Sequence, residues 1–115
     1  MQRPLLVRRV AGGYNRRLME RILDANERIS SLRERVDEVD EELVHLLNER
    51  ARLVQELAEH KLEAGIPLFD PRREEEILRR VVEINEGPIY DSSMRDIFEL
   101  IMHRIRDIEL QRRGE

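Results

Sequence analysis

The chain has 115 residues, of which 40% are apolar, 40% are charged and only 3% are aromatic. This composition predicts one small all-α domain, because sheet proteins need more aromatic and β-branched residues. There is no cysteine and there are three scattered histidines, which exclude a disulfide framework and make us expect no metal site. No apolar run is long enough to cross a membrane, so we expect a cytoplasmic protein.

The net charge of −4 is distributed unevenly. Residues 1–28 carry seven arginines against three acidic residues, whereas residues 29–115 carry 14 basic against 22 acidic residues. We therefore do not expect nucleic-acid binding by the acidic body. Residues 1–28 are expected to form a basic N-terminal arm, poorly ordered up to residue 15 and then either a lead-in turn or an extension of the next helix. This arm could contact a partner enzyme.

The stretch 29–64 is predicted to form one long amphipathic helix, because apolar residues recur at alternating three- and four-residue steps and the first glycine is Gly65. The seam consists of Ile29, Leu32, Val36, Val39, Leu43, Leu46, Leu53 and Leu57. Such a helix is about 50 Å long, and the rest of the chain is too short to cover it. We therefore expect a homodimer with intertwined long helices. Arg50 occupies the seam position where the pattern predicts a leucine.

Two shorter helices are predicted to follow. Asp70 and Pro71 give a strong start signal for a helix over 71–85, with Ile77, Leu78, Val81 and Ile84 buried. Gly87 and Pro88 end it, and a third helix over 91–112 carries the apolar stripe Met94, Ile97, Phe98, Ile101, Ile105 and Ile108. The expected fold is a three-helix chain whose first helix is the longest.

Several charged residues fall on the faces that should be buried. Arg50 and Lys61 are separated by close to three helical turns and share a face with Val54 and Leu57. Arg33 flanks the seam nearer the N-terminus. Lys61 is also the only lysine among 21 basic residues.

The later helices add three more charged residues. Arg73 and Glu74 precede Ile77 and Leu78 by four, and Glu109 follows Ile105 by four. Taken singly, each charge has a structural explanation. Arg33 could form an ion pair with Asp37, and Glu109 could form one with Arg106 or Arg113. The apolar stem of Arg73 could pack against its neighbours. Taken together, several inward cations predict a pocket for a small organic anion with more than one carboxylate.

This ordered set of residues resembles the all-helical chorismate mutases over roughly 29–109. The resemblance is carried by Leu32-Arg33, Val36-Asp37, Asp40, Leu47-Asn48-Glu49-Arg50, Lys61, Ile66-Pro67 and Asp70-Pro71-Arg72-Arg73-Glu74. It implies a domain over 29–113 that forms an intertwined homodimer with two active sites. It also implies an isomerase of the shikimate pathway, which converts chorismate to prephenate in aromatic amino acid biosynthesis.

The resemblance also implies roles for individual residues. Arg50 and Arg33 would bind the two substrate carboxylates, with Arg33 supplied by the partner chain. Lys61 and Glu109 would donate to the ether oxygen, and Lys61 also to a carboxylate. Asp70 and Arg73 would shape the pocket, and Glu74 would hold the ring hydroxyl. Ile105 stands where the family commonly has a hydroxyl residue that touches a carboxylate, so this contact lacks its counterpart here.

A unimolecular pericyclic rearrangement suits these residues, because it requires shape and fixed charge, with no cofactor, metal or nucleophile. Glu109 could donate a hydrogen bond only when protonated, so activity is expected to rise as the pH falls. Two alternatives remain open. The same fold supports an isochorismate-pyruvate lyase, and the chain could be a non-catalytic helical dimer, either a regulatory module or an adaptor.

Overall fold

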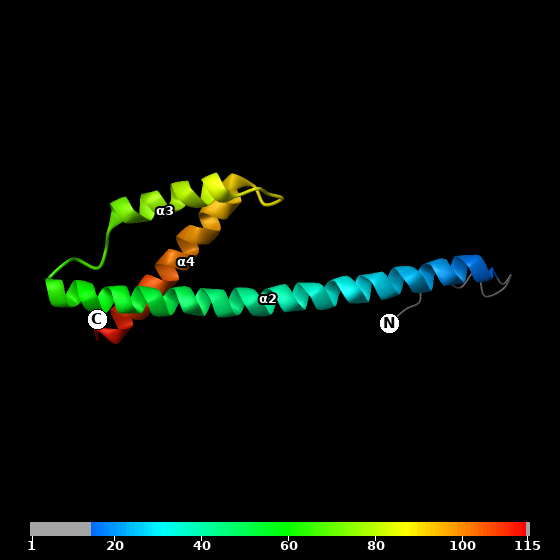
Figure 1. The fold of residues 1–115 in the computed structure, drawn as a ribbon, viewed down its shortest axis with the longest axis horizontal. Helices are drawn as coiled ribbons and strands as arrows, with labels where there is room; N and C mark the ends of the chain where they lie inside the picture. The colour runs from blue at the N-terminus through cyan, green and yellow to red at the C-terminus, as the bar shows by residue number, and fades with distance from the viewer. Residues whose placement is uncertain (1–14, 115) are drawn as a thin grey trace. The chain divides into compact units, whose positions relative to one another are not determined.

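The structure is a computed structural model that describes residues 15–114. These residues form three helices and no strand: α2 (Arg16–Ala64), α3 (Pro71–Ile84) and α4 (Asp91–Arg112) (Figure 1). The all-α class and the order of a long, a short and a medium helix are confirmed. None of the helices in the described range is long and apolar enough to span a membrane. The expectations for residues 1–14 lie outside the described residues.

Helix α2 begins earlier than the long helix that the seam alone predicts. The Asn15 side chain caps it, because Oδ1 accepts a hydrogen bond from the Leu18 N–H at 3.1 Å. Residues 16–28 therefore extend the following helix, which is one of the two alternatives that the sequence leaves open. The boundary at residue 29 between an arm and a domain stays a prediction.

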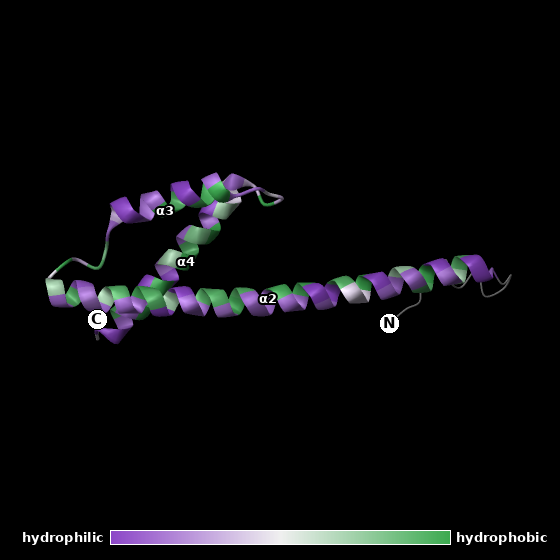
Figure 2. Ribbon diagram, in the orientation of Figure 1, coloured by the Kyte–Doolittle hydropathy of each residue, from purple (hydrophilic) through white to green (hydrophobic). Residues whose placement is uncertain are grey.

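The chain divides into two compact units, 1–44 and 45–115, and each is considered by itself. In the first unit, the α2 seam residues Leu32, Val36 and Val39 are 54–58% exposed. In the second unit, Leu53 and Leu57 on the same helix are equally exposed. Figure 2 shows apolar and polar residues alternating along α2. A single chain thus leaves its longest apolar seam uncovered within the described range.

The end of α2 is fixed by Gly65, whose φ of +69° lies in the left-handed region. The Gly65 N–H donates to the Leu62 carbonyl at 3.2 Å and the Ile66 N–H to the Lys61 carbonyl at 2.8 Å. This pair of bonds is a Schellman motif, which satisfies carbonyls that the ending helix would leave unpaired. The chain can then turn into the link over 65–70 that leads to α3.

Within the second unit, α3 and α4 pack against each other, and the end of α4 lies close to α2 (Figure 1). The buried apolar residues are Ala58, Leu78, Val81, Met102 and Ile105. The predicted burial of Ile84 is wrong, since its side chain is 65% exposed. Ile84 is the last residue of α3, and most of its side chain is open to solvent where the helix ends.

Candidate functional site

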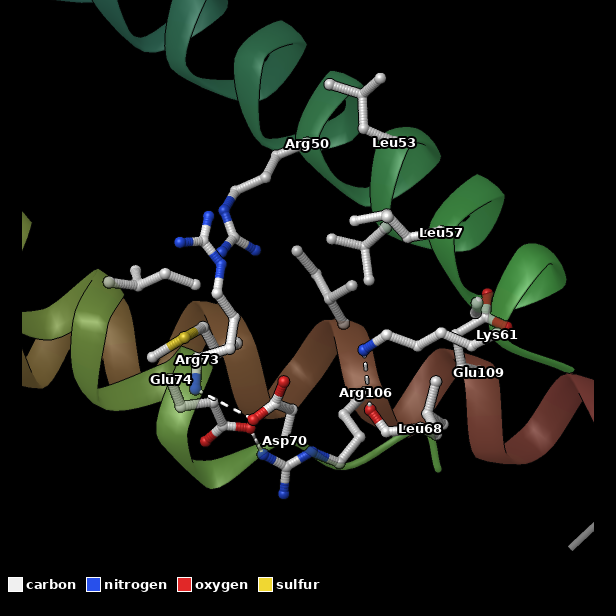
Figure 3. Close-up of a pocket in the computed structure, with 15 residues that line it drawn as sticks. Arg50, Leu53, Leu57, Lys61, Leu68, Asp70, Arg73, Glu74, Arg106 and Glu109 are labelled. Carbon is white, nitrogen blue, oxygen red and sulfur yellow. Dashed lines mark hydrogen bonds and ion pairs between the residues drawn. The ribbon is translucent and has the colours of Figure 1, made fainter. Parts of the chain in front are cut away.

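A pocket of about 210 Å³ lies within the second unit, between the C-terminal part of α2, the link, α3 and α4 (Figure 3). Its apolar lining comes from all four segments. The lining residues are Arg50, Leu53, Val54, Leu57, Ala58, Lys61, Leu68, Asp70, Arg73, Glu74, Ile77, Met102, Ile105, Arg106 and Glu109. Charged groups therefore enter an otherwise hydrocarbon cavity, where electrostatic interactions are stronger than in water.

Two guanidinium groups meet at one end of the pocket. Arg50 comes from α2 and is partly buried, and Arg73 comes from the first turn of α3 (Figure 3). The pKa of Arg50 is lowered, chiefly because burial removes water from the cation and also because Arg73 carries the same charge. Arg73 donates to Glu76 at 3.3 Å. The Arg50 cation is thus held at an energetic cost that a bound anion would relieve.

Lys61 enters the pocket from the last turn of α2, where the helical spacing places it three turns beyond Arg50. Its Nζ donates to the Leu68 carbonyl of the link at 3.4 Å (Figure 3). Neither Lys61 nor Arg50 forms an ion pair with a carboxylate of residues 15–114. The ammonium group therefore keeps donors that a ligand could use.

Glu109 is the most buried charged residue of the second unit, at 3% exposure. Its Oε1 accepts a hydrogen bond from Arg112 Nη1 at 2.8 Å, one turn further along α4. Arg112 also donates to Glu59 of α2 at 3.4 Å, and the two acidic partners raise its pKa, Glu109 first. The structural partner of Glu109 is therefore Arg112, whereas the sequence had suggested Arg106 or Arg113.

The link and the start of α3 present two further carboxylates. The Asp70 side chain caps α3 by accepting a hydrogen bond from the Arg73 N–H at 3.1 Å (Figure 3). Glu74 forms an ion pair with Arg106 of α4 through Oε2 and Nη2. The Arg106 guanidinium carbon also lies 4.4 Å from the centre of the Phe69 ring. Both carboxylates are therefore engaged by donors of the protein: Asp70 by the Arg73 N–H and Glu74 by the Arg106 side chain.

Seven of the eight residues predicted from sequence line this pocket: Arg50, Lys61, Asp70, Arg73, Glu74, Ile105 and Glu109. Ile105 contributes only hydrocarbon and is buried. Arg33 belongs to the other unit, is exposed and is not among the lining residues. The predicted roles of all eight residues stay predictions.

The sequence reasoning missed several lining residues, of which Arg106 is the most consequential. From the sequence alone, Arg106 is expected only as an ion-pair partner for Glu109. Its spacing offers a signal, since Arg106 follows buried Met102 by four residues and precedes Glu109 by three. Residues at these steps share one helix face. The spacing gives the face, but only the structure shows that Glu74 is the partner.

Comparison with known proteins places the chain in a family. Residues 32–110 match chorismate mutase type II. A chorismate mutase from Thermus thermophilus (form II) is 44% identical and superposes with a TM-score of 0.70 over 71% of this chain and 93% of that one. Form I of the same enzyme gives a TM-score of 0.67 over 68% and 98% of the two chains.

Curated relatives agree. A chorismate mutase from Methanocaldococcus jannaschii is 29% identical over 74% of this chain and 87% of its own length. A bifunctional chorismate mutase/prephenate dehydratase from Aquifex aeolicus is 35% identical over 71% of this chain. The chain spans only 22% of the length of that bifunctional relative. Since the family match covers well over half of the sequence and the fold agrees, this chain belongs to the chorismate mutase type II family.

Proposed function

We propose that this protein converts chorismate to prephenate in the pocket of the second unit. The observation that carries the proposal is the presence of Arg50 and Lys61 in one partly apolar cavity, where no carboxylate of the described residues forms an ion pair with either cation. A partly buried cation without an ionic partner is costly in a folded protein unless a ligand pairs with it. Chorismate is a dianion and supplies such partners.

The rearrangement breaks the ether C–O bond and forms a C–C bond in one molecule, with no proton or group transferred to the protein. The flexible dianion must be held with its side chain folded over the ring, and the ether oxygen gains negative charge as the bond breaks. A rigid pocket supplies the first requirement and fixed donors supply the second. A rate gain of about a millionfold needs roughly 8 kcal/mol of preferential transition-state stabilisation.

In this proposal Arg50 binds one carboxylate, and Lys61 donates to the ether oxygen and to a carboxylate. The compact ammonium group of Lys61 suits a single atom that gains charge. Glu109, in its protonated form, is the second donor to the ether oxygen. Its Oε1 accepts from Arg112, which leaves Oε2 for the substrate. Glu74 accepts a hydrogen bond from the ring hydroxyl of the substrate. Asp70 and Arg73 shape the wall of the pocket near Glu74.

We further propose that the active form is a cytoplasmic homodimer in which Arg33 of each chain completes the pocket of its partner. The support is the exposed α2 seam, whose leucines and valines a second copy would bury. Subunit mixing tests this directly. Arg33→Ala and Lys61→Ala should each be inactive, whereas an equimolar mixture after exchange should regain about a quarter of the wild-type rate, because half of the dimers then hold one intact site.

A mixture as inactive as its components would contradict the shared site. Each variant taken alone through the same exchange procedure is the control, because it measures the residual activity of that variant.

The proposed reaction is tested by following the loss of chorismate absorbance on addition of the purified protein, with products identified by chromatography. We expect prephenate from the wild type and at least a hundredfold lower rate from Lys61→Ala. His60→Ala is the matched control, since this neighbouring side chain is 72% exposed and does not line the pocket. Pyruvate released from isochorismate would instead identify a lyase. No turnover of either compound would indicate a non-catalytic binding module.

A further inference from the structure

We propose that Arg106 is a positioning residue that fixes the carboxylate of Glu74 for recognition of the substrate's ring hydroxyl. This inference rests on the proposed function, in which Glu74 accepts a hydrogen bond from that hydroxyl. Arg106 itself acts through Glu74 and needs no contact with the reacting atoms.

The contact between the two side chains joins α3 to α4 at the wall of the pocket. Arg106 Nη2 pairs with Glu74 Oε2, and both side chains are largely buried, at 26% and 23% exposure. Partly buried ion pairs with a hydrogen bond hold their geometry better than exposed ones, because little water competes for either group. Glu74 is therefore restrained by a residue 32 positions away in the sequence.

The guanidinium of Arg106 is restrained in turn. Its central carbon lies 4.4 Å from the centre of the Phe69 ring, which belongs to the link before α3. A cation over an aromatic face is attracted to the ring, and a planar guanidinium can stack there while its edge donates hydrogen bonds. Three segments thus converge on one carboxylate: the link, α3 and α4.

This arrangement has two consequences for ligand binding. Arg106 occupies Oε2, and no hydrogen bond from residues 15–114 reaches Oε1, which remains available to a hydroxyl donor. The ion pair also directs Glu74 toward Arg106 of α4, and no ion pair joins Glu74 to Arg50 within residues 15–114 (Figure 3). Arg50, which the proposed function assigns to a substrate carboxylate, therefore keeps no carboxylate partner among residues 15–114.

If Arg106 has a purely structural role, a different effect on activity is expected. A second ion pair between α3 and α4 allows the two roles to be distinguished. Arg95 of α4 also pairs with a carboxylate of α3, Glu75, at 3.1 Å, but neither residue lines the pocket. If the Arg106 pair only clamped the two helices together, loss of either pair would have similar effects on activity.

The experiment compares chorismate with an analogue that lacks the ring hydroxyl, using the wild type, Arg106→Met, Arg106→Lys and Arg95→Met. Arg106→Met should lower kcat/KM for chorismate by roughly 10- to 100-fold, the range expected for loss of a charged hydrogen bond. The rate with the analogue should change by less than about threefold, so discrimination between the two substrates collapses. Arg106→Lys should recover part of the discrimination. Arg95→Met should keep all of it.

A double-mutant cycle with Glu74→Ala completes the test. In that background Arg106→Met should change kcat/KM for chorismate by less than about twofold, because the group that it positions is gone. Undiminished discrimination in a folded Arg106→Met protein, or an equal loss for both substrates, would overturn the inference while leaving the proposed reaction intact. If Arg106→Met does not fold, the same criterion applies to Arg106→Lys. An inactive wild type would overturn both proposals.

Discussion

Replacing Arg50 by leucine should make the protein more stable and almost inactive. Arg50 stands at an apolar seam position, is partly buried and lines the pocket beside Arg73. Its lowered pKa means that the folded state disfavours the charged form. For a base with a depressed folded-state pKa, this cost is present at every pH below that pKa, and an arginine remains charged at all working pH values. The wild type therefore carries the cost throughout.

The size of the effect follows from two contributions of the same sign. Relief of the repulsion from Arg73, screened because both groups reach solvent, contributes on the order of 0.5 kcal/mol. Removal of the desolvation cost, the larger of the two causes, contributes somewhat more, so Arg50→Leu should raise the free energy of unfolding by about 1 kcal/mol. The activity should fall at least a hundredfold, because no other group on α2 can form a bidentate contact with a carboxylate at this position.

Urea unfolding at a fixed protein concentration measures the stability, and chorismate turnover measures the activity. Arg52→Leu, which removes an exposed arginine two residues away, should change stability by less than about 0.5 kcal/mol and leave turnover intact. Prephenate at about 100 times its Kd should stabilise the wild type by roughly 2.7 kcal/mol and should have little effect on Arg50→Leu. A variant that loses more than about 1 kcal/mol of stability, or one that keeps its activity, would refute the reasoning.

Three further predictions concern residues around the pocket. Glu109→Gln should move the activity optimum toward neutrality, because an amide donates a hydrogen bond at every pH whereas a carboxyl must be protonated; an unchanged profile of kcat/KM against pH would contradict this role. Gly65→Ala should lower the free energy of unfolding by about 1 kcal/mol in urea titrations, since φ is +69° there. Asp70→Ala should cost about 1 kcal/mol through loss of the α3 cap, and equal stability would show that the cap contributes nothing.

Local signals in the sequence account for much of the fold. Asp70 caps α3 and Gly65 ends α2, as the side chain of the first and the backbone freedom of the second predict. These features depend on neighbours within a few residues, so the sequence contains all the information that they require. Ile84 shows where this fails. The burial of Ile84 depends on which residues pack against the end of α3, and hydrophobic periodicity does not identify those residues.

The same limit applies to the pocket. Helical spacing predicts that Arg50 and Lys61 share a face, because the rise and turn of one helix are known in advance. It does not predict that Arg112 pairs with Glu109, since several arginines of α4 lie within reach along the helix. Nor does it predict the pairing of Arg106 with Glu74, which requires the packing of two helices. Composition and periodicity therefore identify the charged groups, and tertiary packing selects their partners.

That selection determines the charge that a ligand meets. Two carboxylates of the pocket, Glu74 and Glu109, pair with arginines of α4, namely Arg106 and Arg112. If Glu74 turned instead toward Arg50, it would neutralise a cation that the proposed substrate needs. The ion pair that each of these arginines forms therefore has a second effect, because it leaves the cations that point into the pocket available to bind a ligand. The positive character of the pocket toward a dianion depends on charges that the dianion itself need never touch.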